Sequence, residues 1–191
     1  MALDFAEATN WACLLLLAGI GAWFAAAIGH FNKKSPRRPL LILMQALWLA
    51  AGLATVIAVA TNQRIPPLRS LAGAAAAILA AVLFRVAVRA TRNKSLSVAF
   101  SRTTAPALVQ SGPYRYVRHP LYTSYVIFWI SCALVSGTSL VAVLVAVIVV
   151  LYVVAARMEE QDILGSELGP AYRTYKSRTG MLLPSPFKAH E

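Results

Sequence analysis

Charged side chains are scarce in this sequence. Only 13% of its 191 residues are charged, whereas 59% are hydrophobic and the mean hydropathy is +0.64. A soluble globular domain has about a quarter of its residues charged, so this composition excludes one. It predicts an integral membrane protein.

Cysteine is also rare. The chain has 2 cysteines, Cys13 and Cys132, and both lie within apolar runs. A disulfide framework or a thiolate metal site would need a different arrangement of cysteines. Both are therefore excluded, and the two thiols are expected to be small packed side chains within the membrane.

Four apolar regions predict membrane helices, each of which needs about 20 residues to cross a bilayer. Three are single runs at about residues 11–29, 40–60 and 69–88. The fourth, about 121–156, is too long for one span and is interrupted by SGTS at 136–139. We therefore predict an all-α, polytopic membrane helix bundle of about five transmembrane helices. The last two would form a tight helical hairpin, with further helical segments in the cytosol.

The first three helices are expected to act as a scaffold. The first run should stay as a helix rather than be cleaved, because acidic Asp4 and Glu7 precede it where a signal peptide carries positive charge. The stretch GAAAAILAA at 73–81 consists largely of small residues, which allow helices to pack closely in a membrane.

The chain is interpreted as a single membrane domain, residues 1–191. Residues 1–90 would form the three-helix scaffold. Residues 91–191 would hold an interfacial segment, the hairpin and a cytosolic cofactor-binding region. The interfacial segment, at 91–111, is too polar to span the membrane and is expected to be partly helical, ending near Pro106.

The charge that is present is mostly positive and unevenly placed. There are 7 acidic and 18 basic residues, a net charge of +11. If the hydrophilic segments alternate across the membrane, the side with the N-terminus holds only Arg64 and Arg69 of the basic residues. Because basic loops stay in the cytoplasm, we predict the N-terminus outside and the C-terminus inside. Topology and anionic lipids account for the charge, so no nucleic-acid partner is expected.

Polar side chains gather at one end of the predicted hairpin. The stretch GPYRYVRHPLY at 112–122 precedes it, and Glu159 and Glu160 end it. A turn within SGTS pairs the start of one helix with the end of the other, roughly 8–10 Å apart between axes. Residue 118 is then opposite about residue 157, so Arg118 and His119 should face Arg157 to Glu160.

Pro120 is expected to begin a helix, because proline is favoured at the first helical position and disfavours helical geometry in the residue before it. The helix start, Arg115 and Arg118 would attract an anion, whereas the two glutamates would attract a cation. S-adenosylmethionine is a zwitterion that offers both. The alternative is that the arginines and tyrosines only anchor the helix end. No metal site is expected, because His119 and the glutamates form a partial ligand set.

These residues resemble the C-terminal half of the isoprenylcysteine carboxyl methyltransferase family and its relatives, the phospholipid N-methyltransferases. The shared pattern is G-x-Y-x-x-x-R-H-P-x-Y, a hydrophobic hairpin, an arginine followed by paired glutamates, G-x-x-Y-x-x-Y and a closing proline. The resemblance covers about residues 108–184. The matching positions are Gly112, Tyr114, Arg118, His119, Pro120, Tyr122, Arg157, Glu159, Glu160, Gly169, Tyr172, Tyr175 and Pro184.

The resemblance implies an enzyme that transfers a methyl group in line from S-adenosylmethionine, bound in a cytosolic pocket, to an acceptor that enters from the lipid side. The acceptor stays open among an isoprenylcysteine-like carboxylate, a phospholipid headgroup amine and a small thiol. The short chain is typical of a prokaryotic member, which places it in the bacterial inner membrane among membrane lipids. Its oligomeric state is left open.

The resemblance also implies roles for individual residues. Arg118 and His119 would hold the methionine carboxylate, and one of the two glutamates would hold the ammonium. Arg173 and Arg178 would either steer an acidic acceptor or lie on a solvated face. The expected cofactor-binding residues are Gly112, Tyr114, Arg118, His119, Pro120, Leu121, Tyr122, Arg157, Glu159 and Glu160, and the expected catalytic residues are His119, Arg118, Glu160 and Arg173.

Two other functions fit parts of the sequence. Sterol-type membrane reductases end in a similar R-Y-x-x-H-P block and use NADPH, but they are generally longer, and the paired glutamates favour methyl transfer. A non-enzymatic membrane scaffold could keep the motif for packing alone. Binding of S-adenosylmethionine or of NADPH would distinguish the three.

Overall fold

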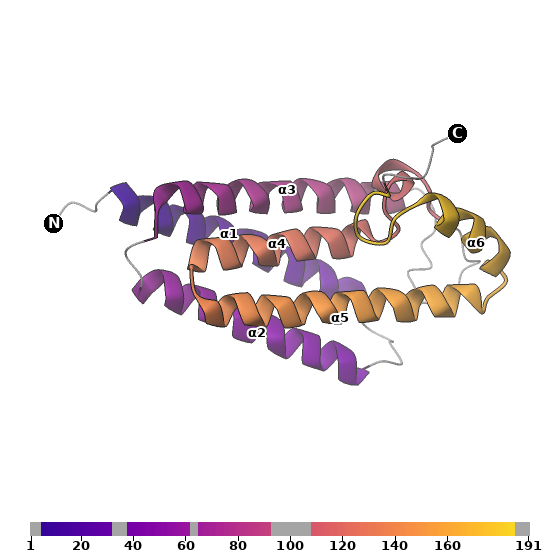
Figure 1. Cartoon of the computed structure of the whole chain (residues 1–191), viewed down its shortest axis with the longest axis horizontal. Helices are drawn as coiled ribbons and strands as arrows, with labels where there is room; N and C mark the ends of the chain where they lie inside the picture. Colours follow the sequence, from indigo (N-terminus) through magenta and orange to yellow (C-terminus); the bar gives the residue numbers. More distant parts are fainter. Residues whose placement is uncertain (1–4, 32–37, 62–64, 93–107, 186–191) are drawn as a thin grey trace.

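The computed structural model describes residues 5–31, 38–61, 65–92 and 108–185. Within these residues the chain forms helices and no strand (Figure 1), which confirms the predicted all-α class. The elements in chain order are α1 (Phe5–Phe31), α2 (Arg38–Thr61), α3 (Pro67–Arg92), the short 3-10 helix η1 (Gly112–Arg115), α4 (Pro120–Ser136), α5 (Ser139–Leu164) and α6 (Gly169–Arg178).

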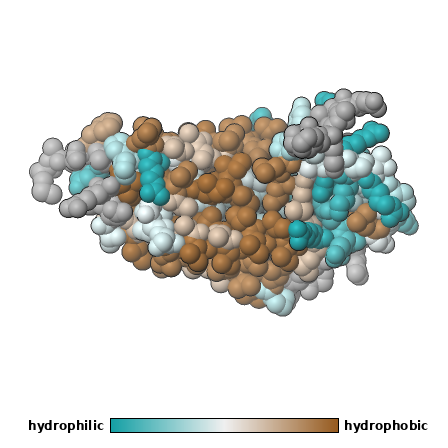
Figure 2. All heavy atoms as spheres, viewed as in Figure 1, coloured by the Kyte–Doolittle hydropathy of each residue, from teal (hydrophilic) through white to brown (hydrophobic). Residues whose placement is uncertain are grey.

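Four of the described helices are long and apolar enough to cross a membrane. Hydrophobic side chains cover the middle of the molecule, and hydrophilic ones gather at the end that carries α6 (Figure 2). This confirms the prediction of a polytopic membrane helix bundle. The four apolar spans are Glu7–Ala26, Pro39–Thr61, Pro67–Thr91 and Ser139–Leu164.

The fifth apolar helix, α4, is shorter than the sequence prediction implied. It has 17 residues, fewer than the roughly 20 that cross a bilayer, because it begins only at Pro120 and ends before Gly137. It lies between α3 and α5 (Figure 1) and also contacts α1 and α2. Neighbouring helices therefore cover much of its surface, and α4 forms the centre of the bundle.

Small residues bring α3 and α4 close together, as the GAAAAILAA stretch predicts. A Cβ atom on Gly73 would lie only 2.4 Å from Val135 Cγ2. Farther along α3, Ala77 and Ala80 are fully buried. Packing of this kind replaces the hydrophobic driving force that helices lack within lipid.

Serine side chains on α4 are buried without loss of hydrogen bonding. The hydroxyls of Ser124 and Ser131 donate to the carbonyls of Leu121 and Phe128, each at 2.6 Å. A buried hydroxyl without a partner would be costly, so these bonds within one helix let a small polar residue lie at a helix contact.

The hairpin turn falls within SGTS, as predicted. Gly137 has a left-handed backbone (φ 68°), and its N–H donates to Ala133 O at the end of α4. Thr138 caps α5 by accepting from Val141 N. The turn directs the two helices back along each other, and it lies opposite the end of the bundle that holds η1 and α6 (Figure 1). Most of the predicted interfacial segment at 91–111, including its expected end near Pro106, lies outside the described residues.

Candidate functional site

The segment before α4 pairs with the chain that follows α6. Val117 and Gly180 form a parallel bridge, and Arg118 N donates to Gly180 O at 2.8 Å. Position 180 requires glycine, because an added Cβ atom would lie 1.7 Å from Leu183 O. The C-terminal part of the predicted motif thus closes over the start of α4.

The helix start has the predicted geometry. Pro120 is the first residue of α4, and His119 before it has a non-helical backbone (φ −122°, ψ 61°). Thr123 secures the turn, since its N–H donates to His119 O at 3.0 Å and its hydroxyl donates to Leu182 O at 2.7 Å. His119 is therefore held at a fixed point between α4 and the C-terminal segment.

Arg118 forms a buried ion pair with Glu160. Its Nε lies 2.7 Å from Glu160 Oε1, and the side chains are only 7% and 4% exposed. Its Nη1 donates to Thr179 O and, at 3.5 Å, to Lys176 O. The structure brings the predicted pair together. It also shows that Arg118 ties α4, α5 and α6 to one another.

Lys176 was missed by the sequence analysis. Its Nζ lies 2.7 Å from Glu160 Oε2, with the lysine side chain 43% exposed. The spacing of the tyrosines in α6 could have indicated it. Tyr172 and Tyr175 are buried, and position 176 lies four residues after Tyr172, on the same helix face. Glu160 therefore carries a cation on each of its oxygens.

His119 lies between the two glutamates. Its Nδ1 is 3.6 Å from Glu159 Oε2, and its Nε2 is 3.4 Å from Glu160 Oε1. That Nε2 is buried and, among the described residues, has no partner in hydrogen-bond geometry. Tyr122 stacks on the imidazole at 5.5 Å, with 9° between the ring planes, and its hydroxyl donates to Glu159 Oε1. The buried ring nitrogen is thus available to a ligand.

Aromatic rings continue from this polar group into the bundle. Tyr122 contacts Tyr152 with ring centroids 5.3 Å apart, and Tyr152 stacks on Tyr125 at 5.6 Å. Trp48 of α2 donates from Nε1 to the Tyr152 hydroxyl at 2.7 Å. The sequence analysis assigned no role to Tyr125 or Tyr152, because tyrosines within apolar runs are hard to distinguish from ordinary packing.

Tyrosines also fix η1 against α6. The Tyr175 hydroxyl donates to Tyr114 O at 2.7 Å. Burial raises the pKa of Tyr175 to about 12 and raises the pKa of Tyr114 and Tyr172 as well. All three phenols therefore stay neutral at physiological pH and can act as hydrogen-bond donors.

Other residues of the predicted set lie away from this buried group. Arg157 and Arg173 have exposed side chains, in contrast to Arg118. Gly112 is exposed and adopts a left-handed backbone (φ 59°), which begins η1. Leu121 packs against the hydrophobic core. The charged groups that the structure brings together are thus fewer than predicted, with Lys176 added.

Comparison with known proteins places this arrangement in a family. The sequence profile of the phospholipid methyltransferase family matches residues 68–169, just over half of the chain. The match confirms the resemblance. It also begins within α3, whereas the motif resemblance began at about residue 108, so α3 belongs to the shared unit.

Three curated relatives match a shorter part of the chain. A methanethiol S-methyltransferase from a Pseudomonas species is 36% identical over 80 residues, covering 41% of this chain and 29% of the relative. Methanethiol S-methyltransferase 1 of Bradyrhizobium diazoefficiens is 36% identical over 72 residues (37% and 24%). The methanethiol S-methyltransferase of Mycobacterium tuberculosis is 37% identical over 76 residues (39% and 30%). The matched segment thus spans less than a third of each relative.

Proposed function

The chain belongs to the phospholipid methyltransferase family, and on that basis we propose that it transfers a methyl group from S-adenosylmethionine to an acceptor at the membrane. The observation that carries the proposal is the position of His119, which lies between Glu159 and Glu160 with its ring nitrogens 3.6 and 3.4 Å from their oxygens. The family match favours this function over the sterol-type reductase and the non-enzymatic scaffold.

The residues present fit such a cofactor. Lys176 places an ammonium group 2.7 Å from a Glu160 oxygen, so the carboxylates at this end of the bundle pair with ammonium groups, and Glu159 brings a second carboxylate beside His119. The start of α4 offers backbone N–H groups and the positive end of the helix dipole to a carboxylate. The buried Nε2 of His119 adds a polar contact.

The two glutamates are proposed to have different roles. Glu160 is 4% exposed and pairs with both Arg118 and Lys176. Its proposed role is therefore to hold α4, α5 and α6 in position relative to one another. Glu159 is more exposed, at 13%, and it accepts from the Tyr122 hydroxyl. We therefore assign the cofactor ammonium to Glu159. Arg118, a candidate for the methionine carboxylate in the sequence analysis, instead acts as a positioning residue.

Positioning dominates the proposed mechanism. When bound, S-adenosylmethionine supplies an electrophilic methyl group on a sulfonium. The chain holds the reactants in line and keeps water away, which lowers the barrier by removing the entropy cost of bringing them together. A thiol or ammonium acceptor must also lose a proton, and we assign its acceptance to His119 or to the neighbouring glutamate Glu159.

The acceptor is proposed from the relatives' names. All three curated relatives are named for methanethiol, so a small thiol is the first candidate. A lipid headgroup amine is the second, because the family's description names phospholipids. For orientation we propose the topology that the basic residues indicate, with the site on the cytoplasmic side of a bacterial inner membrane.

Calorimetric titration of the detergent-purified chain tests the cofactor. We expect saturable binding of S-adenosylhomocysteine, the demethylated product, and none of NADPH. Glu159→Gln should weaken binding at least about tenfold, since a charged hydrogen bond is lost, whereas Glu167→Gln, the same change at an exposed site, should not. Transfer of a radiolabelled methyl group to a small thiol or to phosphatidylethanolamine then identifies the acceptor. Binding of NADPH alone would overturn the proposal.

A further inference from the structure

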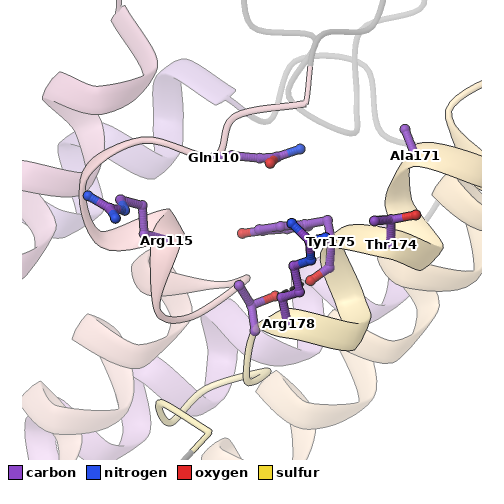
Figure 3. Close-up of a pocket in the computed structure, with 7 residues that line it drawn as sticks. Gln110, Arg115, Ala171, Thr174, Tyr175 and Arg178 are labelled. Atoms are coloured by element: carbon purple, nitrogen blue, oxygen red, sulfur yellow. Dashed lines mark hydrogen bonds between the residues drawn. The ribbon is translucent and has the colours of Figure 1, made fainter. Parts of the chain in front are cut away.

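A second site lies at the polar end of the bundle, between η1 and α6. It is a cavity of about 180 Å³ (Figure 3). Tyr175 lies at its centre, with Gln110 on the η1 side and Thr174 on α6. Thr179 also lines it, and its carbonyl accepts from Arg118. The cavity is thus linked to the proposed methyl-transfer site through Thr179.

The lining of this cavity is basic. Arg115 comes from η1 and Arg178 from the last turn of α6, and both side chains are exposed. None of the lining residues is acidic. The Tyr175 phenol is neutral, and its hydroxyl is used by Tyr114 O. Figure 3 shows the Arg178 side chain beside Tyr175, whereas the Arg115 guanidinium points away from the other lining residues. Arg178 and the polar side chains of the lining are therefore the groups that the cavity offers to an anion, and a guanidinium group binds phosphate in a bidentate manner.

The apolar span of α3 ends close to the cavity, which is the level expected for lipid headgroups. The span within α3 ends at Thr91. A Cβ atom on Gly112, the first residue of η1, would lie 3.3 Å from Ala90 Cβ, so η1 lies beside the point where α3 leaves the membrane. The bridge between Val117 and Gly180 keeps Arg178 near the start of α4, at the same level.

We propose that this cavity binds the phosphate of an anionic phospholipid headgroup. Its volume suits a phosphate group while the glycerol and acyl chains stay in the bilayer. An anionic lipid is favoured over a zwitterionic one because the lining contains two arginines and no carboxylate. The site does not depend on the identity of the methyl acceptor, and its tests use no cofactor.

Native mass spectrometry of the full chain in detergent, titrated with short-chain phosphatidylglycerol, tests this site. Arg115→Gln and Arg178→Gln should each weaken binding about fivefold, as expected for one basic residue near an anionic headgroup, and the double variant about 25-fold. Arg89→Gln removes an exposed arginine of α3 that does not line the cavity, and it should change binding less than about twofold. Short-chain phosphatidylcholine should bind at least about fivefold more weakly than phosphatidylglycerol.

Two results would overturn the proposal. In the first, inorganic phosphate competes as strongly as phosphatidylglycerol does, and the same substitutions weaken its binding. That result would show a site for soluble anions rather than for a lipid. Equal losses in the Arg89→Gln control would show only a general effect of charge. If the glutamine variants aggregate, Arg115→Lys and Arg178→Lys take their place. They keep the charge but lose the bidentate guanidinium, so they should bind phosphatidylglycerol more weakly than wild type does, and unchanged binding in both would overturn the proposal.

Discussion

The Nε atom of Arg118 lies 2.7 Å from Glu160 Oε1, and both side chains are almost fully buried. This pair joins the start of α4 to the end of α5. Because Arg118 also donates to two carbonyls at the end of α6, one guanidinium holds three elements that are distant in sequence. The pair is thus a structural support for the site that His119 and Glu159 would form.

Breaking this pair from one side should destabilise the fold. Arg118→Met leaves Glu160 buried with Lys176 as its remaining cation, and loss of one partner of a buried pair costs about 3–5 kcal/mol. We expect a clearly lower midpoint in a thermal or denaturant unfolding experiment in detergent. Arg118→Met/Glu160→Met should recover part of the loss, because neither charge is then left alone. Equal stability of Arg118→Met and wild type would contradict the assignment.

Lys176 should matter much less for stability. Its side chain is 43% exposed, so solvent screens its attraction to Glu160, and pairs of this kind contribute about 1 kcal/mol or less. Lys176→Met should therefore lower the unfolding midpoint only slightly, measured beside Arg118→Met in the same detergent. Lys176→Arg, which keeps the charge, is the control. A loss as large as that of Arg118→Met would show that Lys176 is part of the support.

Tyr122 should affect the cofactor rather than the fold. Its hydroxyl donates to Glu159, while its ring stacks on His119. Tyr122→Phe keeps the ring and removes the donor, so Glu159 is held less firmly. We expect several-fold weaker binding of S-adenosylhomocysteine by calorimetry, because the carboxylate that receives the ammonium is no longer fixed in place, with a smaller change in the unfolding midpoint than Arg118→Met gives.

A control for Tyr122→Phe is Tyr116→Phe. Tyr116 lies in the same segment but is 49% exposed. Its substitution should leave cofactor affinity unchanged. If the two variants bind the cofactor equally well, Glu159 does not hold the ammonium through this contact.

Local rules predicted the ends of the hairpin well. Pro120 and the residue before it specify a helix start, and the SGTS stretch contains the glycine and threonine that end one helix and begin the next. Once the turn is placed, antiparallel geometry brings Arg118 near residue 160. Positions along the helices therefore follow from the sequence.

Rotation of the helices did not follow from the sequence. Arg157 and Glu160 are three residues apart on α5, yet the first is exposed and the second buried. The side of α5 that is covered depends on where α6 docks. That docking rests on backbone bonds between residues 116–119 and 180–181, which no side-chain pattern encodes. The rotation of α6 was open in the same way, and only the buried pair Tyr172 and Tyr175 distinguishes the face of Lys176 from that of Arg173.

Close approach of α3 and α4 offers a test of the bundle itself. A Cβ atom on Gly73 would lie 2.4 Å from Val135 Cγ2 and 3.2 Å from Ser131 O, whereas one on Gly19 would meet nothing within 4 Å. Gly73→Ala should therefore cost about 1–3 kcal/mol by overpacking. Gly19→Ala, the matched change on α1, should be neutral or slightly stabilising, because alanine is the better helix former.

The overpacking in Gly73→Ala can be relieved by a second substitution at Val135. Val135→Ala removes the methyl groups that the new Cβ atom would meet. The double variant Gly73→Ala/Val135→Ala should therefore lose less unfolding free energy than the two single variants lose together. Thermal unfolding of the four proteins in one detergent measures this coupling. Strict additivity, or a Gly73→Ala protein as stable as Gly19→Ala, would mean that α3 and α4 are not in close contact. In that case the helix that carries His119 at its start would not be the centre of the bundle.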